Sequence, residues 1–230
     1  MSRLATMVMH DARLQFRYGI YAAYAFVVAF YVVALVSLSS QLPSWVPAFI
    51  VFSDPAALGF FFLGALMMLE RSEGVRAALA TTPLTVLDYL GAKMLTLTTV
   101  AVASSMALHL ASGREGNVIL LAAGVALTSV QYIGIGIPIA LRFKTVSGYL
   151  MGSAGFLTPV IAPAFLALLD PFPAWLAVIP SIGQFRLLLI ATGATEGSVQ
   201  EVVWLLAICV AAAIGAIFLA YRSMRLELGR

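Results

Sequence analysis

Residues 18–53 read YGIYAAYAFVVAFYVVALVSLSSQLPSWVPAFIVFS and contain no Lys, Arg, Asp or Glu. A helix needs about 20 apolar residues to cross roughly 30 Å of hydrocarbon, so this run holds one crossing and the start of a second. The run must be helical, because a strand edge in lipid would leave backbone groups unpaired. The turn between the two crossings falls at residues 41–47, where Trp45 suits the headgroup level.

The rest of the chain repeats this pattern. Hydrophobic residues make up 62% of the 230 residues and charged residues only 10%, which is far from the usage of soluble domains. Further uncharged runs cover residues 94–113, 116–141, 145–169 and 202–221. The sequence therefore predicts an all-α, polytopic membrane protein that forms one domain over residues 1–230.

Six transmembrane helices are expected, at residues 20–38, 48–69, 94–111, 118–141, 146–169 and 202–221. The stretch between the last two is different. Residues 171–185 are uncharged but contain Pro171, Pro173, Pro180 and Gly183, so they are too short and too broken to cross a membrane. We expect a broken external hairpin, re-entrant or interfacial, between spans five and six.

The first residues have the pattern of a helix that lies in the membrane interface. In residues 3–18 the basic side chains gather on one side of a helical wheel and the apolar ones on the adjacent side. Asp11 interrupts the apolar side.

The basic residues set the expected orientation. With six crossings, eleven of them lie on one side, and only Arg114 and Arg186 lie on the other. Positive residues favour the cytoplasmic side, so both termini are predicted to be cytoplasmic in a multi-pass protein of the inner (plasma) membrane. The eleven are Arg3, Arg13, Arg17, Arg71, Arg76, Lys93, Arg142, Lys144, Arg222, Arg225 and Arg230.

The residues that catalysis requires are absent from the sequence. His10 and His109 are the only histidines, they belong to opposite faces, and Cys209 is the only cysteine. There is no H-E-x-x-H, no G-x-S-x-G and no phosphate-binding G-x-x-x-x-G-K-[ST] motif. We expect no enzyme activity, no cofactor and no metal, and any ATP must bind to another chain. The net charge of +3 comes without a basic cluster, so nucleic acid is not an expected partner.

Four polar residues inside the predicted spans are candidates for a substrate path: Asp54, His109, Gln131 and Tyr132. Asp54 and His109 are expected near the outer ends of their spans. There they are either partly solvated, or paired with each other or with Arg186, or they lie at the external mouth of the path. Gln131 and Tyr132 either form hydrogen bonds between helices or line the path. Gly134 and Gly136, together with Pro138, indicate a kink or close helix packing. The Gly148-x-x-x-Gly152 pattern indicates a close-packing face, either within the chain or at a dimer seam.

The segment ERSEGVRAALATTPLTVLDYLGAK at residues 70–93 is the longest predicted internal connection. Its first half favours a short helix that ends at Thr82-Pro83, and Thr85 with Asp88 offers a capping pair for the next span. Two interpretations are open: a solvated loop helix, or a helix that a cytoplasmic ATPase moves.

Several motifs resemble those of the permease subunits of ABC-2 type transporters, and are similar above all to fluoroquinolone-export permeases of actinobacteria. They are Gly59-Phe-Phe-Phe-Leu-Gly64, Glu70-Arg71, Thr82-Pro83-Leu84, Tyr89-Leu-Gly-Ala-Lys93 and, more weakly, Ile179-Pro180 with the leucines at 187–189.

This resemblance implies a separate ABC ATPase beneath the permease, a second permease subunit that is identical or different, and a coupling helix between spans two and three. The coupling residues that it implies are Glu70, Arg71, Glu73, Gly74, Arg76, Leu79 and Pro83.

The function expected from these features is the transmembrane half of an ATP-driven exporter of amphipathic, drug-like or lipid-like molecules. An ion-coupled secondary transporter, a membrane-embedded enzyme and a membrane anchor for another complex are the alternatives. The absence of charge from spans one, four, five and six argues against the ion-coupled transporter.

Overall fold

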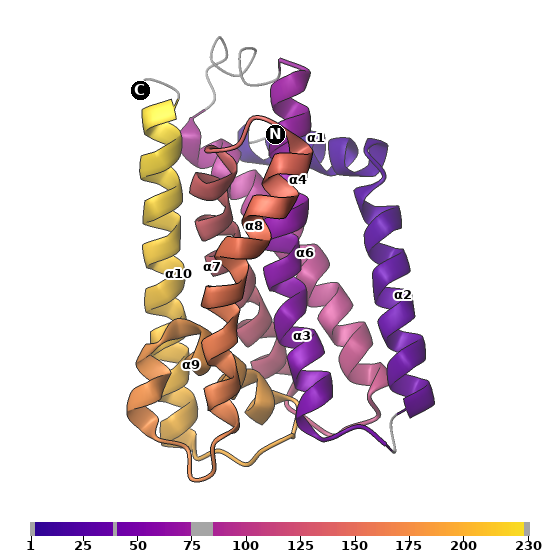
Figure 1. The fold of residues 1–230 in the computed structure, drawn as a ribbon, viewed down its shortest axis with the longest axis vertical. Coiled ribbons are helices and arrows are strands. Elements are labelled where there is room, and N and C mark those ends of the chain that lie inside the picture. The colour runs from indigo at the N-terminus through magenta and orange to yellow at the C-terminus, as the bar shows by residue number, and fades with distance from the viewer. Residues whose placement is uncertain (1–2, 39–40, 75–84, 228–230) are drawn as a thin grey trace.

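The computed structural model describes residues 3–38, 41–74 and 85–227, and within these ranges it contains helices and no strands. Figure 1 shows long helices side by side in one bundle. Six are long and apolar enough to cross a membrane, which confirms the predicted number. They are Ile20–Leu38, Trp45–Arg71, Val86–Ala111, Val118–Ala140, Val146–Leu168 and Val199–Glu227.

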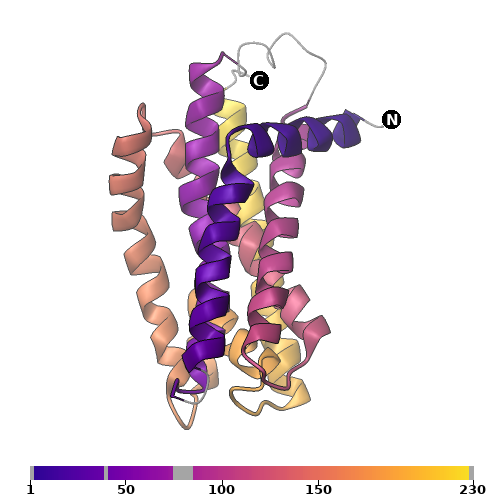
Figure 2. The same ribbon diagram turned by 90° about the vertical axis from the view of Figure 1, so that its right-hand side faces the viewer.

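Helix α1 (Arg3–Arg17) lies across one end of the bundle, roughly perpendicular to α2 (Ile20–Leu38) (Figures 1 and 2). Gly19 makes the turn between them with a φ of 70°, a conformation that favours glycine. The apolar side of α1 buries Met7 and Leu14 and packs against α6 (Val86–Ala111). The last helix, α10 (Val199–Glu227), ends at the same end of the bundle (Figure 1).

The second span is irregular in its middle. It consists of α3 (Trp45–Ala57), a π-helical turn at Leu58–Phe62 and α4 (Leu63–Ser72). Pro55 lies inside α3 and has no N–H to donate to the preceding turn. The π-helical turn packs against α7 (Val118–Ala140) at a place where no larger residue fits: a Cβ on Gly136 would lie 2.2 Å from the carbonyl oxygen of Gly59.

Helix α7 forms the centre of the bundle, between α6, α3 and α10. The second glycine of the pair, Gly134, lies against the backbone of Ala216 on α10, so close packing at the Gly134–Gly136 pair is confirmed. In the second glycine pattern, a Cβ on Gly152 would collide with the ring of Phe143 at 2.3 Å. Gly152 therefore serves packing within the chain, whereas Gly148 is exposed.

The segment between the last two spans forms the predicted broken hairpin at the far end of the bundle. Helix α8 (Val146–Ile161) continues into a 3₁₀ turn, η2 (Ala162–Leu168), followed by η3 (Ala174–Val178) and α9 (Pro180–Ala191). With 12 residues, α9 is too short to cross a membrane. It is mostly buried and packs against α3, α7 and η2.

The third span begins earlier than expected. Thr85 and Asp88 form the predicted capping box, and α6 starts at Val86 rather than at residue 94. Lys93 is therefore a helix residue, two turns into α6, and not part of a loop. The break predicted at Thr82-Pro83 lies outside the described residues.

Candidate functional site

A buried group of polar side chains joins α1, α4 and α6 at the end of the bundle where α1 lies. We call it the lysine cluster. Lys93 on α6 is fully buried, and its Nζ lies 2.5 Å from Oδ1 of Asp11 on α1 and 2.5 Å from Oε1 of Glu70 on α4. The cluster consists of Asp11, Gln15, Glu70, Tyr89, Lys93 and Thr96.

Each carboxylate oxygen in the lysine cluster has a partner. Gln15 Nε2 and Thr96 Oγ1 donate to Oδ2 of Asp11 at 2.7 and 2.6 Å, and the hydroxyl of Tyr89 donates to Oε2 of Glu70 at 2.7 Å. Burial of a charge is tolerated when the charge is both paired and hydrogen-bonded. The cluster therefore fixes α1 to the two spans that flank residues 73–85.

This arrangement corrects two expectations for the coupling segment. Glu70 is not an exposed charge that is free to pair with an ATPase, because its side chain is 1% exposed and binds Lys93. Lys93 is not a surface charge of a loop. The one sequence signal for the cluster was Asp11, which interrupts the apolar side of α1 because Lys93 lies opposite it.

The remaining coupling candidates lie at the end of α4. Arg71, Glu73 and Gly74 are exposed, and Gly74 has a φ of 70°. The hydroxyl of Tyr18, next to the α1–α2 turn, donates to Oε2 of Glu73 at 2.6 Å. Burial, and secondly this hydrogen bond, raise the pKa of Tyr18 to about 12. Arg76, Leu79 and Pro83 lie outside the described residues.

A second buried group, the Asp54 cluster, joins three spans at membrane depth. It consists of Tyr24 on α2, Asp54 on α3 and Ser104 on α6. Tyr24 and Ser104 both donate to Oδ2 of Asp54, the latter at 2.6 Å, and their hydroxyl oxygens are 2.9 Å apart. Asp54 lies about 14 Å along its helix from Trp45, well inside a hydrocarbon layer roughly 30 Å thick.

The expected surroundings of Asp54 were wrong. Its side chain is 4% exposed, so it is not partly solvated. Within the described ranges, no Lys, Arg or His nitrogen lies within 4 Å of its carboxylate. His109 lies beside Gly116 near the outer end of α6, and Arg186 pairs with Glu201 at 2.8 Å instead.

The two candidates on α7 have different partners. Gln131 accepts a hydrogen bond from Nε2 of Gln184 on α9 at 2.5 Å, so it joins two helices. The ring of Tyr132 packs edge-on against Phe52 and Phe60. Among the described residues, no hydrogen bond, ion pair or ring contact links either one to Asp54 or His109, so the four candidates do not form one site.

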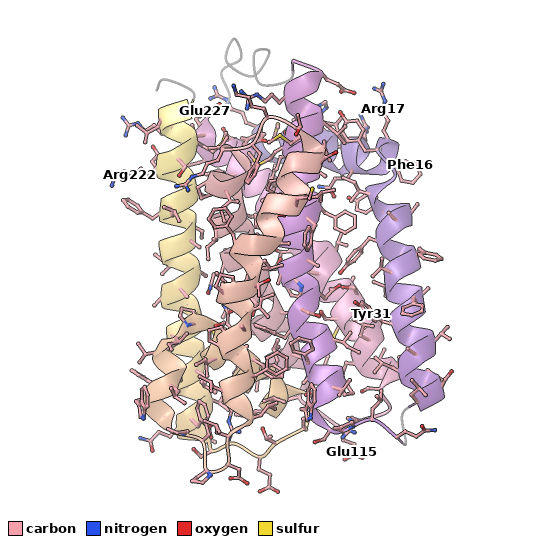
Figure 3. The ribbon with its side chains drawn as sticks, viewed as in Figure 1. Phe16, Arg17, Tyr31, Glu115, Arg222 and Glu227 are labelled. Atoms are coloured by element: carbon pink, nitrogen blue, oxygen red, sulfur yellow. The ribbon has the colours of Figure 1, made fainter. Side chains whose placement is uncertain are left out.

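Figure 3 labels side chains at both ends of the bundle and on α2. Phe16 and Arg17, at the end of α1, project outward, whereas Tyr31 lies on the side of α2 that packs against the bundle. Glu115 marks the far end of the bundle, and Arg222 and Glu227 mark the end shared with α1. The lysine cluster includes α1 and therefore lies at that shared end, whereas Ser104 of the Asp54 cluster lies about three helical turns further along α6.

Comparison of the sequence with known protein families identifies the family of this chain. The family model for the fluoroquinolones export permease protein family matches residues 2–226. The chain belongs to this family. It is therefore a membrane transport permease, and the enzyme alternative is set aside.

Two relatives of the permease come from Mycobacterium tuberculosis: the fluoroquinolones export permease protein Rv2687c of strain H37Rv and its counterpart MT2761 of strain CDC 1551. Each is 27% identical over 194 residues, which cover 82% of this chain and 80% of the relative. No solved structure matches the permease.

Proposed function

We propose that this permease is the transmembrane subunit of an ATP-driven ABC exporter and that a separate subunit hydrolyses the ATP. One observation carries the proposal: the lysine cluster ties α1, α4 and α6 into a single unit around residues 73–85. A force applied to that connection would move all three helices together, because breaking a buried ion pair is costly.

Helix α6 links the segment at residues 73–85 to the interior of the membrane. Lys93 and Ser104 are three helical turns apart, so they lie on one face of α6 about 16 Å from each other. Lys93 belongs to the lysine cluster and Ser104 to the Asp54 cluster. A rigid helix with both clusters on one face is a physical route from a cytoplasmic ATPase to the membrane interior.

The proposed coupling segment is residues 70–83, with its exposed residues in contact with the ATPase. Arg71 and Glu73 offer charges of both signs to a partner. We assign Glu70 a different part: it anchors the segment to Lys93 from inside.

The proposed cargo is amphipathic and drug-like or lipid-like. Both relatives are named fluoroquinolones export permease proteins, and fluoroquinolones fit this class. At the far end of the bundle, a cavity of about 680 Å³ between the start of α3 and the hairpin is a candidate exit. Its lining includes Trp45, Asp170, Arg186 and Glu196. Two permease subunits in the plasma membrane, with their termini in the cytoplasm, would form one path.

Co-expression with an ATPase encoded next to the permease tests this function. We expect the ATPase to co-purify with the permease and to support efflux of a fluoroquinolone. Reversing Arg71 and Arg76 to Glu places like charges against the partner and should abolish co-purification or uncouple hydrolysis from efflux. The matched control reverses Arg142 and Lys144, which lie in the other internal connection. Normal efflux by the Arg71/Arg76 variant would rule out the coupling role.

The buried Asp54 favours one other candidate, an ion-coupled secondary transporter, because such carriers use intramembrane carboxylates. Efflux by the permease alone, driven by a proton gradient and indifferent to the ATPase, would favour this second candidate.

A further inference from the structure

Asp54 is an acid inside a transmembrane span, and in the described part of the chain no basic side chain lies beside it. An ionisable group at this depth is costly and is retained where it has a function. In the lysine cluster the same chain supplies a lysine to balance its buried carboxylates, but in the Asp54 cluster the partners are two hydroxyl groups. The missing counter-ion is the feature to be explained.

The hydrogen bonds of Asp54 leave part of its carboxylate open. The hydroxyls of Tyr24 and Ser104 both donate to Oδ2. Across the described ranges, Oδ1 accepts no hydrogen bond. A carboxylate held at one oxygen and open at the other is positioned to accept a hydrogen bond from a ligand.

One hydroxyl partner of Asp54 belongs to an aromatic pair. The ring of Tyr24 packs edge-on against Phe62, with ring centres 5.7 Å apart. Aromatic rings attract cations through their faces, so this pair favours a cationic ligand over a neutral one. Pro55 follows Asp54 directly and provides no N–H donor that could compete for the acid.

Of the three helices that form the Asp54 cluster, α2 is the least enclosed. Only 17% of the α2 span is buried, against 59% of the span that carries Asp54. The outward side chains of Phe26 and Phe30 are 77% and 66% exposed. Since Tyr24 is the contribution of α2 to the cluster, a small displacement of α2 removes one hydroxyl from Asp54 and opens the site.

We propose that Asp54 binds the protonated amine of the transported molecule, so that this permease selects amphipathic amines over neutral amphiphiles. The inference rests on the proposed export function and specifies its substrate class. An ammonium group supplies the missing counter-ion and donates to Oδ1, whereas a neutral molecule leaves the acid unpaired.

The test compares two probes: a fluoroquinolone with a free, basic piperazine amine, and its N-acetyl derivative, in which that nitrogen is a non-basic amide. Binding of each probe to the purified full-length permease in lipid nanodiscs is measured by probe fluorescence, which requires no ATPase. Efflux of each probe is measured in cells that also express the ATPase. The variants are Asp54→Asn, Asp54→Glu and, as a matched removal of a neighbouring hydrogen bond, Ser104→Ala.

We expect Asp54→Asn to weaken binding and efflux of the amine by about tenfold or more, the usual value of a hydrogen bond to a charged group. Binding of the N-acetyl probe should be weak and unchanged. Asp54→Glu, which keeps the charge, should retain most of the preference, and Ser104→Ala should change binding by less than about fivefold.

Equal loss of both probes in Asp54→Asn would overturn the inference, and so would unchanged binding of the amine or its failure to bind the wild type. Selective binding without ATP-dependent efflux would instead contradict the export function and leave the amine site standing. The two proposals therefore fail separately.

Discussion

The permease buries carboxylates in two places and treats them differently. In the lysine cluster, Asp11 and Glu70 share Lys93, and each of their oxygens has a partner. In the Asp54 cluster, a single acid has two hydroxyl partners, no cation and one oxygen without a hydrogen bond in the described part of the chain. One cluster has its own counter-ion, whereas the other lacks one.

The positions of the clusters explain the difference. The lysine cluster joins the helices that surround the proposed coupling segment, where a fixed geometry transmits movement. The Asp54 cluster joins α2, α3 and α6 inside the membrane, where a permanent lysine would prevent a cationic ligand from binding. We infer that Asp11 and Glu70 are structural, because Lys93 of the same chain neutralises them. The Asp54 carboxylate has no such partner in the described part of the chain and is therefore available to bind a cationic ligand.

The largest effect is expected from Lys93→Met, which removes the cation and leaves two buried carboxylates together. Breaking a buried ion pair in this way costs about 3–5 kcal/mol. We expect low abundance in the membrane and a strongly reduced melting temperature in detergent. Both are measured by size-exclusion chromatography with fluorescence detection during heating.

The control neutralises the whole group: Asp11→Asn, Glu70→Gln and Lys93→Met together. If charge pairing is the cause, this variant regains most of the stability, because no charge remains unpaired. A triple variant as unstable as Lys93→Met alone would show that the shape of the lysine, and not its charge, stabilises the cluster.

The sequence was sufficient for the spans but not for the clusters. Charge-free runs indicate the positions of the six crossings, although Asp54 interrupts the second and the third begins before its run. The prolines between residues 171 and 180 mark the segment that does not cross. The clusters depend on distant pairs: Asp11 and Lys93 are 82 residues apart, and Asp54 and Ser104 are 50 apart. Hydroxyl side chains are common in the spans, so nothing local distinguishes Tyr24 or Ser104.

Other misses have a physical cause as well. The π-helical turn at Leu58–Phe62 goes together with the close approach of Gly59 and Gly136, two residues in different spans. Periodicity along one helix cannot reveal such a contact. The early start of α6 is an exception, because the Thr85–Asp88 capping box is local in the sequence and is sufficient to place the first helical residue at Val86.

The next largest effect is expected from Tyr24→Phe, which removes one hydroxyl from Asp54 and keeps the ring against Phe62. A hydrogen bond contributes about 0.5–1.5 kcal/mol, so the melting temperature should fall moderately. Val28→Ala on the same side of α2 is the matched packing control. If the proposed site is correct, Tyr24→Phe keeps its preference for the amine probe, and a lost preference would assign recognition to the tyrosine.

A smaller effect on stability is expected from Asp54→Asn, below about 1 kcal/mol, because the change breaks no ion pair and the amide oxygen still accepts from Tyr24 and Ser104. The melting temperatures of Asp54→Asn and Lys93→Met, measured in the same detergent, give this comparison directly. If Asp54→Asn lost as much thermal stability as Lys93→Met, the proposed difference between the two clusters would be wrong.

The smallest effect is expected at Tyr18, whose hydrogen bond to Glu73 lies near the lysine cluster but is exposed. Tyr18→Phe should cost less than about 1 kcal/mol, as exposed polar contacts do.

The pKa of Tyr18 is raised to about 12, from an ordinary value of about 10. Since the folded protein favours the neutral hydroxyl, its contribution is complete below about pH 10 and is lost as the pH rises through about 12. The gap in melting temperature between wild type and Tyr18→Phe should therefore be present at pH 8 and shrink by pH 11. Tyr221→Phe, which removes a hydroxyl from α10, is the control. A difference in melting temperature that stays constant from pH 8 to pH 11 would show that the Tyr18–Glu73 hydrogen bond does not contribute to stability. The lysine cluster alone would then attach α1 to α4.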